Sequence, residues 1–197
     1  MRATTRRELI PGPAGKIECA VDEPSGAARG VALIAHPHPL FGGTLDNKVV
    51  QTLARAFVEL GYSAWRPNFR GVGASEGRHD EGRGEVDDLA AVLEFTKAVN
   101  PVLAGFSFGA AMQATLAQVT APSRMVLVGL AVNKFPAPPV PADTILVHGE
   151  KDDTVPLAAV LDWALKLDLP VVVVPGADHF FHKRLNILRA IVTNNWK

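Results

Sequence analysis

The residue best placed for covalent chemistry is Ser107, in the segment Gly105-Phe106-Ser107-Phe108-Gly109. An apolar run over 101–104 precedes this segment, and a helical pattern over 110–117 follows it. A serine on a sharp strand-to-helix turn is typical of a nucleophile elbow, where the backbone is strained and its neighbours lie very close. Glycine at positions 105 and 109 tolerates that approach because it has no Cβ atom. The segment therefore predicts a serine hydroxyl lifted above the edge of a sheet.

Two further side chains are needed for a serine nucleophile to work: a base, and an acid that orients the base. Asp152 and Asp153 follow a predicted strand over 144–148, and His179 follows the apolar run over 171–174. Ligand sites in open α/β sheets lie beyond the carboxyl ends of strands, and Ser, Asp, His is the order expected for this elbow. We therefore expect Ser107 to attack an acyl carbonyl while His179 transfers the proton and one of the aspartates orients the imidazole.

An oxyanion formed in this reaction needs two hydrogen-bond donors. One is the backbone N–H of Phe108, the residue after the nucleophile. The other should come from the loop after the strand over 30–35, which begins His36-Pro37-His38-Pro39-Leu40. The two prolines have no N–H, so His38 or Leu40 must donate. We favour His38, with Leu40 second, and we expect the His36 side chain to support the loop through hydrogen bonds.

The elements that must position these residues alternate regularly between strand and helix. Nearly continuous Val, Ile and Leu runs predict buried strands, and apolar residues at helical spacing predict the helices between them. The predicted strands cover 30–35, 62–69, 101–104, 124–131, 144–148 and 171–174, and the predicted helices cover 46–60, 85–99, 110–117, 156–167 and 183–194. This alternation indicates an α/β fold with an open, mostly parallel sheet and helices on both faces.

Two other stretches complete the predicted architecture. Residues 5–23 contain a Pro/Gly turn over 11–15 between two short strand-like pieces, which indicates an N-terminal antiparallel hairpin at a sheet edge. The connection over 132–143 has about a dozen residues, many of them proline, and is too short to build a helical cap over the site. We therefore expect an open site and a single domain over 1–197.

Composition excludes several other classes of protein. The chain has 20 Lys+Arg and 20 Asp+Glu, so no global charge favours nucleic acid or an anionic membrane. Its one cysteine, Cys19, permits no intrachain disulfide and suits a reducing compartment. No apolar run approaches the roughly 18 residues that span a bilayer. These features predict a soluble, cytoplasmic protein with no nucleic-acid or membrane partner, and nothing in the sequence indicates an oligomeric state.

Other chemical sites fit the sequence poorly. The histidines at 36, 38, 179 and 182 lack a coherent set of carboxylate or thiolate partners, so we expect no metal site. Gly71 and Gly73 lack the third glycine of a dinucleotide fingerprint, so we expect no nucleotide cofactor. Arg70 fits a salt-bridged scaffold better than a contact to an acidic substrate. Of Phe106 and Phe108, we expect one to pack beneath the elbow and the other to line an acyl pocket.

From residue 30 onward the chain resembles the α/β-hydrolase superfamily, and in particular its small, capless, dienelactone-hydrolase-like members. The resemblance rests on the elbow, on 36–43 with 46–50, on 68–77, on His148-Gly149 with Asp152 and Val155-Pro156, and on 176–181. It implies that Asp152, rather than Asp153, is the acid. Asp178 departs from the family pattern, in which a small residue commonly precedes the histidine, and its charge is placed to perturb the pKa of His179.

The resemblance and the residues together indicate a serine hydrolase acting on small carboxylic esters or thioesters. A peptidase or amidase on the same three side chains is the alternative, although 197 residues show no substrate-gating domain. A non-catalytic scaffold is a third reading, which an intact Ser, Asp and His set disfavours.

Overall fold

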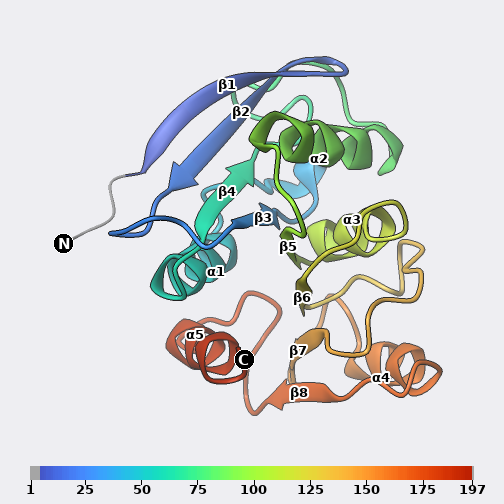
Figure 1. Ribbon diagram of the computed structural model, residues 1–197. Coiled ribbons are helices and arrows are strands. Elements are labelled where there is room, and N and C mark those ends of the chain that lie inside the picture. Colours follow the sequence, from blue (N-terminus) through green and yellow to red (C-terminus); the bar gives the residue numbers. More distant parts are fainter. Residues whose placement is uncertain (1–4, 197) are drawn as a thin grey trace.

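The computed structural model describes residues 5–196. Eight strands form one sheet in the order β1-β2-β4-β3-β5-β6-β7-β8 (Figure 1). The strands are β1 (Arg6–Gly12), β2 (Gly15–Asp22), β3 (Val31–Ala35), β4 (Ser63–Pro67), β5 (Val102–Phe106), β6 (Arg124–Val128), β7 (Ile145–Gly149) and β8 (Val171–Val174).

The pairing of these strands confirms the predicted mostly parallel sheet. β1 and β2 form the expected antiparallel hairpin at one edge, and β2 pairs with β4 in antiparallel register. All pairs from β4 through β3, β5, β6 and β7 to β8 are parallel. The carboxyl ends of six strands therefore meet at one edge of the sheet, where the predicted reactive residues follow β3, β5, β7 and β8.

Within residues 5–196, five α-helices cover the two faces of the sheet (Figure 1). Apolar side chains of α2 (Arg83–Thr96), α3 (Phe108–Leu116) and α4 (Leu157–Leu165) pack in one core layer, which includes Leu89, Met112 and Val160. Side chains of α1 (Lys48–Glu59) and α5 (Leu185–Asn194) pack in the other, which includes Phe57 and Leu188. Strand residues alternate between the two layers, so burial on both faces explains the continuous apolar runs of the parallel strands.

Element boundaries differ from the sequence predictions by a few residues. The strand predicted over 62–69 is five residues long. β6 ends at Val128, three positions before the end of the predicted run, because Gly129 follows with a positive φ of 54°. A short 3-10 helix, η1 (Pro39–Phe41), occupies part of the Pro/Gly-rich loop after β3 and was not predicted. This turn orders the loop that carries His38 and Leu40.

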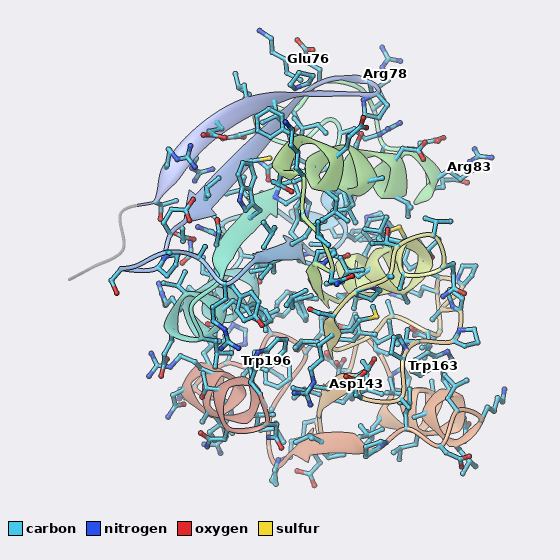
Figure 2. The ribbon with its side chains drawn as sticks, viewed as in Figure 1. Glu76, Arg78, Arg83, Asp143, Trp163 and Trp196 are labelled. Atoms are coloured by element: carbon cyan, nitrogen blue, oxygen red, sulfur yellow. The ribbon has the colours of Figure 1, made fainter. Side chains whose placement is uncertain are left out.

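The connection from β6 to β7 forms no cap, as predicted. It runs over 129–144 without a helix or strand, and it is tied to the body of the fold by two side chains. Trp163 of α4, labelled in Figure 2, donates its Nε1–H to the Ala137 carbonyl at 2.7 Å, and Gln118 donates to the Pro139 carbonyl at 2.8 Å. Within residues 5–196, no helix has both the length and the apolar character needed to cross a bilayer.

Candidate active site

Ser107 follows β5 directly and has a backbone conformation that non-glycine residues rarely adopt, with φ 56° and ψ −117°. The turn leaves no room for side chains on either side of it. A Cβ atom at Gly105 would lie 2.5 Å from the Gly109 carbonyl oxygen, and one at Gly109 would lie 2.4 Å from the Ala35 carbonyl oxygen. Only glycine fits at these two positions, so the sequence pattern follows from the close packing of the turn.

The helix behind the turn is held to the sheet by a buried glutamine. Gln113 of α3 donates its amide hydrogens to the Leu33 and Ala104 carbonyls, both at 3.0 Å. These acceptors belong to β3 and β5, so one side chain binds α3 to the two strands whose loops meet at Ser107. The start of α3, and with it the Phe108 N–H, is thereby fixed relative to the loop after β3.

His179 and Asp152 form a hydrogen-bonded chain with Ser107. His179 Nε2 lies 3.0 Å from Ser107 Oγ, and His179 Nδ1 lies 2.6 Å from Asp152 Oδ2. The other carboxylate oxygen, Oδ1, accepts from the Thr154 and Val155 N–H groups at 2.9 and 2.7 Å. Asp152 is therefore an acceptor on both oxygens, and Nδ1–H of His179 points at it. This leaves the lone pair of Nε2 directed at the serine hydroxyl.

The environment of Asp152 keeps it ionised. Burial alone would raise the pKa of Asp152, but hydrogen bonds from His179 and the Val155 N–H outweigh burial and hold the pKa below its ordinary value. The neighbouring Asp153 is exposed and contacts Thr154 instead. The geometry thus places Asp152, and not Asp153, beside the imidazole.

A second buried histidine lies beside the same carboxylate. His148 Nε2–H donates to the Val155 carbonyl at 2.9 Å and lies 3.5 Å from Asp152 Oδ2. Its side chain is fully buried, and burial is the main cause that lowers its pKa. The neutral ring therefore supports the loop of Asp152 through its hydrogen bond to Val155.

Gly129 allows His179 to reach across the sheet. β6 lies between β5 and β7, so the imidazole must pass over the end of β6. A Cβ atom at Gly129 would lie 3.3 Å from His179 Cε1 and 3.3 Å from a ring carbon of Phe106. The positive φ of Gly129 turns the chain away at this point. Sequence reasoning did not identify this residue, because a single glycine after a strand carries no specific pattern.

The loop after β3 is supported by His36, as expected. His36 Nδ1–H donates to the Pro37 carbonyl at 2.6 Å, and His36 Nε2 accepts from the Phe69 N–H at 3.0 Å. The ring is fully buried, and burial lowers the pKa of His36 to about 4 despite the hydrogen bond to Pro37. A neutral imidazole thus ties the loop to the end of β4.

The two candidate donors of this loop differ in their hydrogen bonds. The Leu40 N–H donates to Nδ1 of His38 at 3.2 Å. In the part of the chain that the structure describes, the N–H groups of His38 and Phe108 have no acceptor. β3 and β5 are neighbours in the sheet, so the loop of His38 adjoins the elbow. The His38 N–H is therefore free to act together with the Phe108 N–H as a hydrogen-bond donor, whereas the Leu40 N–H already has an acceptor.

Several other predicted residues have structural partners. Arg70 forms a two-bonded pair with Asp88 at 2.9 and 2.8 Å, which fits the scaffold role. Asp178 directs its carboxylate at His182 Nδ1, at 2.7 Å, rather than at His179. Phe106 and Phe108 are both fully buried: the Phe106 ring lies 4.8 Å from the His179 ring, and the Phe108 ring lies 4.9 Å from the His38 ring. That one of them lines an acyl pocket stays a prediction.

Sequence reasoning missed a second imidazole near the elbow. His79 Nδ1 lies 2.7 Å from Oε1 of Glu85, whose side chain is fully buried. Glu85 also accepts from the N–H groups of Asp80 and Gly82 at 3.0 and 2.8 Å. Gly82 and Glu85 have the spacing of a capping box at the start of α2. This spacing was the sign in the sequence that Glu85 is held at the start of the helix, where His79 contacts it.

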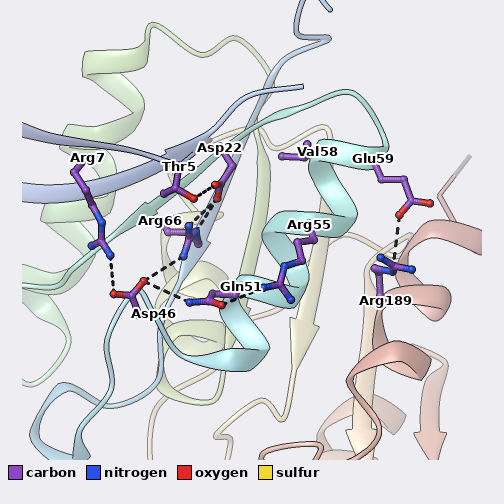
Figure 3. A pocket seen from close by; sticks show the side chains of 10 residues that line it. All are labelled: Thr5, Arg7, Asp22, Asp46, Gln51, Arg55, Val58, Glu59, Arg66 and Arg189. Carbon is purple, nitrogen blue, oxygen red and sulfur yellow. Dashed lines mark hydrogen bonds and ion pairs between the residues drawn. The ribbon is translucent and has the colours of Figure 1, made fainter. Parts of the chain in front are cut away.

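A cleft of about 880 Å³ lies away from these residues, between the N-terminal hairpin, α1 and α5 (Figure 3). Its charged side chains largely face one another, as in the pair between Arg66 and Asp22 at 2.7 Å. Its lining, within the described residues, contains no serine, cysteine or histidine. Among residues 5–196, no three His, Cys, Asp or Glu side chains are grouped to hold a metal ion.

Comparisons with known proteins identify relatives along almost the whole chain, although no family model matches. The uncharacterized protein RP471 of Rickettsia prowazekii (strain Madrid E) is 35% identical over 192 residues, covering 86% of this chain and 79% of that protein. The structure of an α/β serine hydrolase homologue from Coxiella burnetii is 38% identical, with a TM-score of 0.88 and 100% coverage of both chains.

A second solved structure that resembles this chain also has no cap. XC6422 from Xanthomonas campestris, described as an α/β serine hydrolase without a lid, is 34% identical, with a TM-score of 0.90. The match covers 99% of this chain and 94% of that one. With the sheet order, the turn at Ser107 and the short connection after β6, these likenesses lead to one conclusion. The chain belongs to the α/β-hydrolase superfamily, among its members without a lid.

Proposed function

We propose that the chain is a serine hydrolase that cleaves small carboxylic esters or thioesters through an acyl-enzyme at Ser107. The observation that carries this proposal is the hydrogen-bonded chain from Ser107 Oγ through His179 to Asp152, at 3.0 and 2.6 Å. It begins on a turn with the backbone conformation of a nucleophile elbow. The superfamily and the absence of a cap support hydrolysis of a small substrate.

In the first half of the reaction, Ser107 Oγ forms a bond to the acyl carbon while its proton moves to His179 Nε2. Asp152 stabilises the resulting imidazolium through the Nδ1–H hydrogen bond. The oxyanion accepts hydrogen bonds from the Phe108 N–H and the His38 N–H. When the tetrahedral intermediate collapses, the bond to the leaving oxygen or sulfur breaks, and that atom takes the proton from His179.

In the second half, water replaces the alcohol or thiol. His179 Nε2 accepts a proton from water as its oxygen attacks the acyl carbon bound to Ser107. The same two N–H groups stabilise the second oxyanion. Its collapse breaks the bond to Ser107 Oγ, which regains a proton from the imidazolium, and the free acid leaves. Each side chain returns to its starting protonation state.

Turnover of p-nitrophenyl acetate tests the proposal, with Ser107→Ala as the matched variant. We expect measurable hydrolysis by the wild type and a loss of roughly 1,000-fold or more in kcat for the variant. A fluorophosphonate probe should label the wild type at position 107 and leave the variant unlabelled. If folded wild-type protein shows neither turnover nor labelling, the proposal is wrong and a scaffold role is favoured.

An amide of matched structure distinguishes an esterase from an amidase on the same residues. We expect p-nitroacetanilide to be hydrolysed far more slowly than p-nitrophenyl acetate. Comparable kcat/KM values for the two substrates would favour the amidase.

A further inference from the structure

Five aromatic rings form a cluster beside the elbow, and His38 is at its centre. The His38 ring centroid lies 4.7 Å from Phe41, 4.9 Å from both His79 and Phe108, and 5.6 Å from Phe135. The rings meet His38 at tilted angles of 42–51°. They come from four separate segments: the loop after β3, the loop before α2, the start of α3 and the connection after β6. We refer to these five residues as the aromatic cluster.

The aromatic cluster extends from the residue after Ser107 to the molecular surface. Phe108 is fully buried and directly follows Ser107, while Phe41 at the other end is 82% exposed. Leu40, beside Phe41, is 68% exposed. Neighbouring large apolar side chains left in water at a reaction site are typical of a surface that a ligand covers.

Polar contacts orient the two imidazoles of the aromatic cluster. The Leu40 N–H donates to His38 Nδ1, which sets the orientation of the central ring. The buried carboxylate of Glu85 accepts from His79 Nδ1 and sets the second imidazole. Burial lowers the pKa of His38, so its ring is neutral near pH 7 and contacts an apolar group without losing hydration of a charge. Because these rings are already oriented, binding a ligand would order few further side chains, which keeps the entropic cost of binding low.

We propose that the aromatic cluster binds an aryl group of the substrate, so that the preferred esters carry a benzene ring close to the scissile carbonyl. Offset and edge-to-face contacts between rings are favourable beyond the burial of apolar area. A saturated ring of similar size buries similar area but lacks these contacts. This inference rests on the proposed function, since the aryl group is recognised as part of a substrate of Ser107.

Two pairs of esters test the inference, each differing in the aromaticity of one ring. Ethyl phenylacetate and ethyl cyclohexylacetate vary the acyl part, while benzyl acetate and cyclohexylmethyl acetate vary the alcohol. A methylene group insulates the ester from the ring in all four, so intrinsic reactivity is similar within each pair. We expect kcat/KM to favour the aryl member of at least one pair by roughly three- to tenfold.

Phe41→Leu is the diagnostic variant, because Phe41 is exposed and its replacement does not disturb the core. We expect the ratio of aryl to saturated kcat/KM to fall by roughly two- to threefold. Phe95→Leu is the matched control, since Phe95 is 48% exposed on α2 and packs against Trp65 rather than in the cluster. That variant should keep the wild-type ratio.

Equilibrium binding separates this inference from the proposed function. Ser107→Ala should bind phenylacetate more tightly than cyclohexylacetate, by the same few-fold factor, in an NMR titration. Equal kcat/KM values within both ester pairs would overturn the aryl preference, and so would an aryl-to-saturated ratio that Phe41→Leu leaves unchanged. The proposed hydrolase would still stand in either case if p-nitrophenyl acetate is turned over. Equal binding of the two acids by a protein without turnover would overturn both.

Discussion

Mild acid should destabilise this protein through one buried histidine, His36. Its pKa is about 4 in the folded state, because burial disfavours the imidazolium, whereas a histidine in the unfolded chain has a pKa of about 6.5. Between these values the unfolded chain binds the extra proton and the folded one does not. The stability that depends on neutral His36 is therefore present above pH 6.5 and is lost as the pH falls towards 4.

The two pKa values give the size of the effect. They differ by about 2.5, and each pKa unit corresponds to about 1.36 kcal/mol, so the full loss below pH 4 is about 3.4 kcal/mol. Between pH 7 and pH 5 the loss attributable to His36 is about 2 kcal/mol. A protein of this size should then lose about 4–8 °C in Tm from this group alone.

Urea unfolding at pH 7, 6 and 5 measures this loss, with His36→Gln as the reference. Glutamine has no proton to gain in this range, and its oxygen replaces Nε2 as the acceptor for the Phe69 N–H. The variant should be less stable at pH 7, because the donor to the Pro37 carbonyl is lost. Its stability should nevertheless depend less on pH than that of the wild type. An equal wild-type advantage at pH 7 and pH 5 would refute the assignment of a neutral, buried His36.

Three further predictions test the site by substitution. Asp152→Asn removes the charge that orients His179 and should lower kcat by roughly 1,000- to 10,000-fold with little change in KM; a loss under tenfold would contradict the proposed role. Proline fits the φ of −52° at position 38, so His38→Pro removes the N–H without straining the backbone. The kcat of His38→Pro should be roughly 100-fold below that of His38→Ala, which keeps the N–H. The kcat of Leu40→Pro should stay within a few fold of the wild-type value. The reverse order would assign the oxyanion contact to Leu40. Gly129→Ala should lower kcat about tenfold and the free energy of unfolding by about 1 kcal/mol, measured by ester turnover and urea titration, because its Cβ meets His179. Unchanged turnover would show that the imidazole does not depend on this glycine.

The overall architecture was predictable because its signals are local. Continuous apolar runs mark strands buried on both faces, and helical spacing marks the elements between them. Once the strands are known to be parallel, their carboxyl ends must share an edge. The proximity of Ser107, Asp152 and His179 follows from that edge, although the last two lie 45 and 72 positions from the serine. The choice of Asp152 over Asp153 needed the family resemblance, since both follow the same strand.

Boundaries were less predictable because hydrogen bonds decide them. Helix α2 begins at Arg83, two residues before the predicted start, since Glu85 accepts from the Gly82 N–H at 2.8 Å. It ends at Thr96, because Lys97 adopts a left-handed conformation with φ 52°. The η1 turn begins at Pro39, and Gly42 with φ 77° closes it. Apolar periodicity does not report such contacts.

The aromatic cluster shows why substrate selectivity could not be predicted from the sequence. Its rings come from positions 38, 41, 79, 108 and 135, and no local spacing relates them. The connection after β6 is too short to form a cap, yet tethers from Trp163 and Gln118 hold it against the body of the fold. Phe135 on this connection thereby packs 4.9 Å from Phe108. In a hydrolase without a lid, side chains of separate loops must form the wall that a cap would otherwise supply, so selectivity depends on how those loops are anchored.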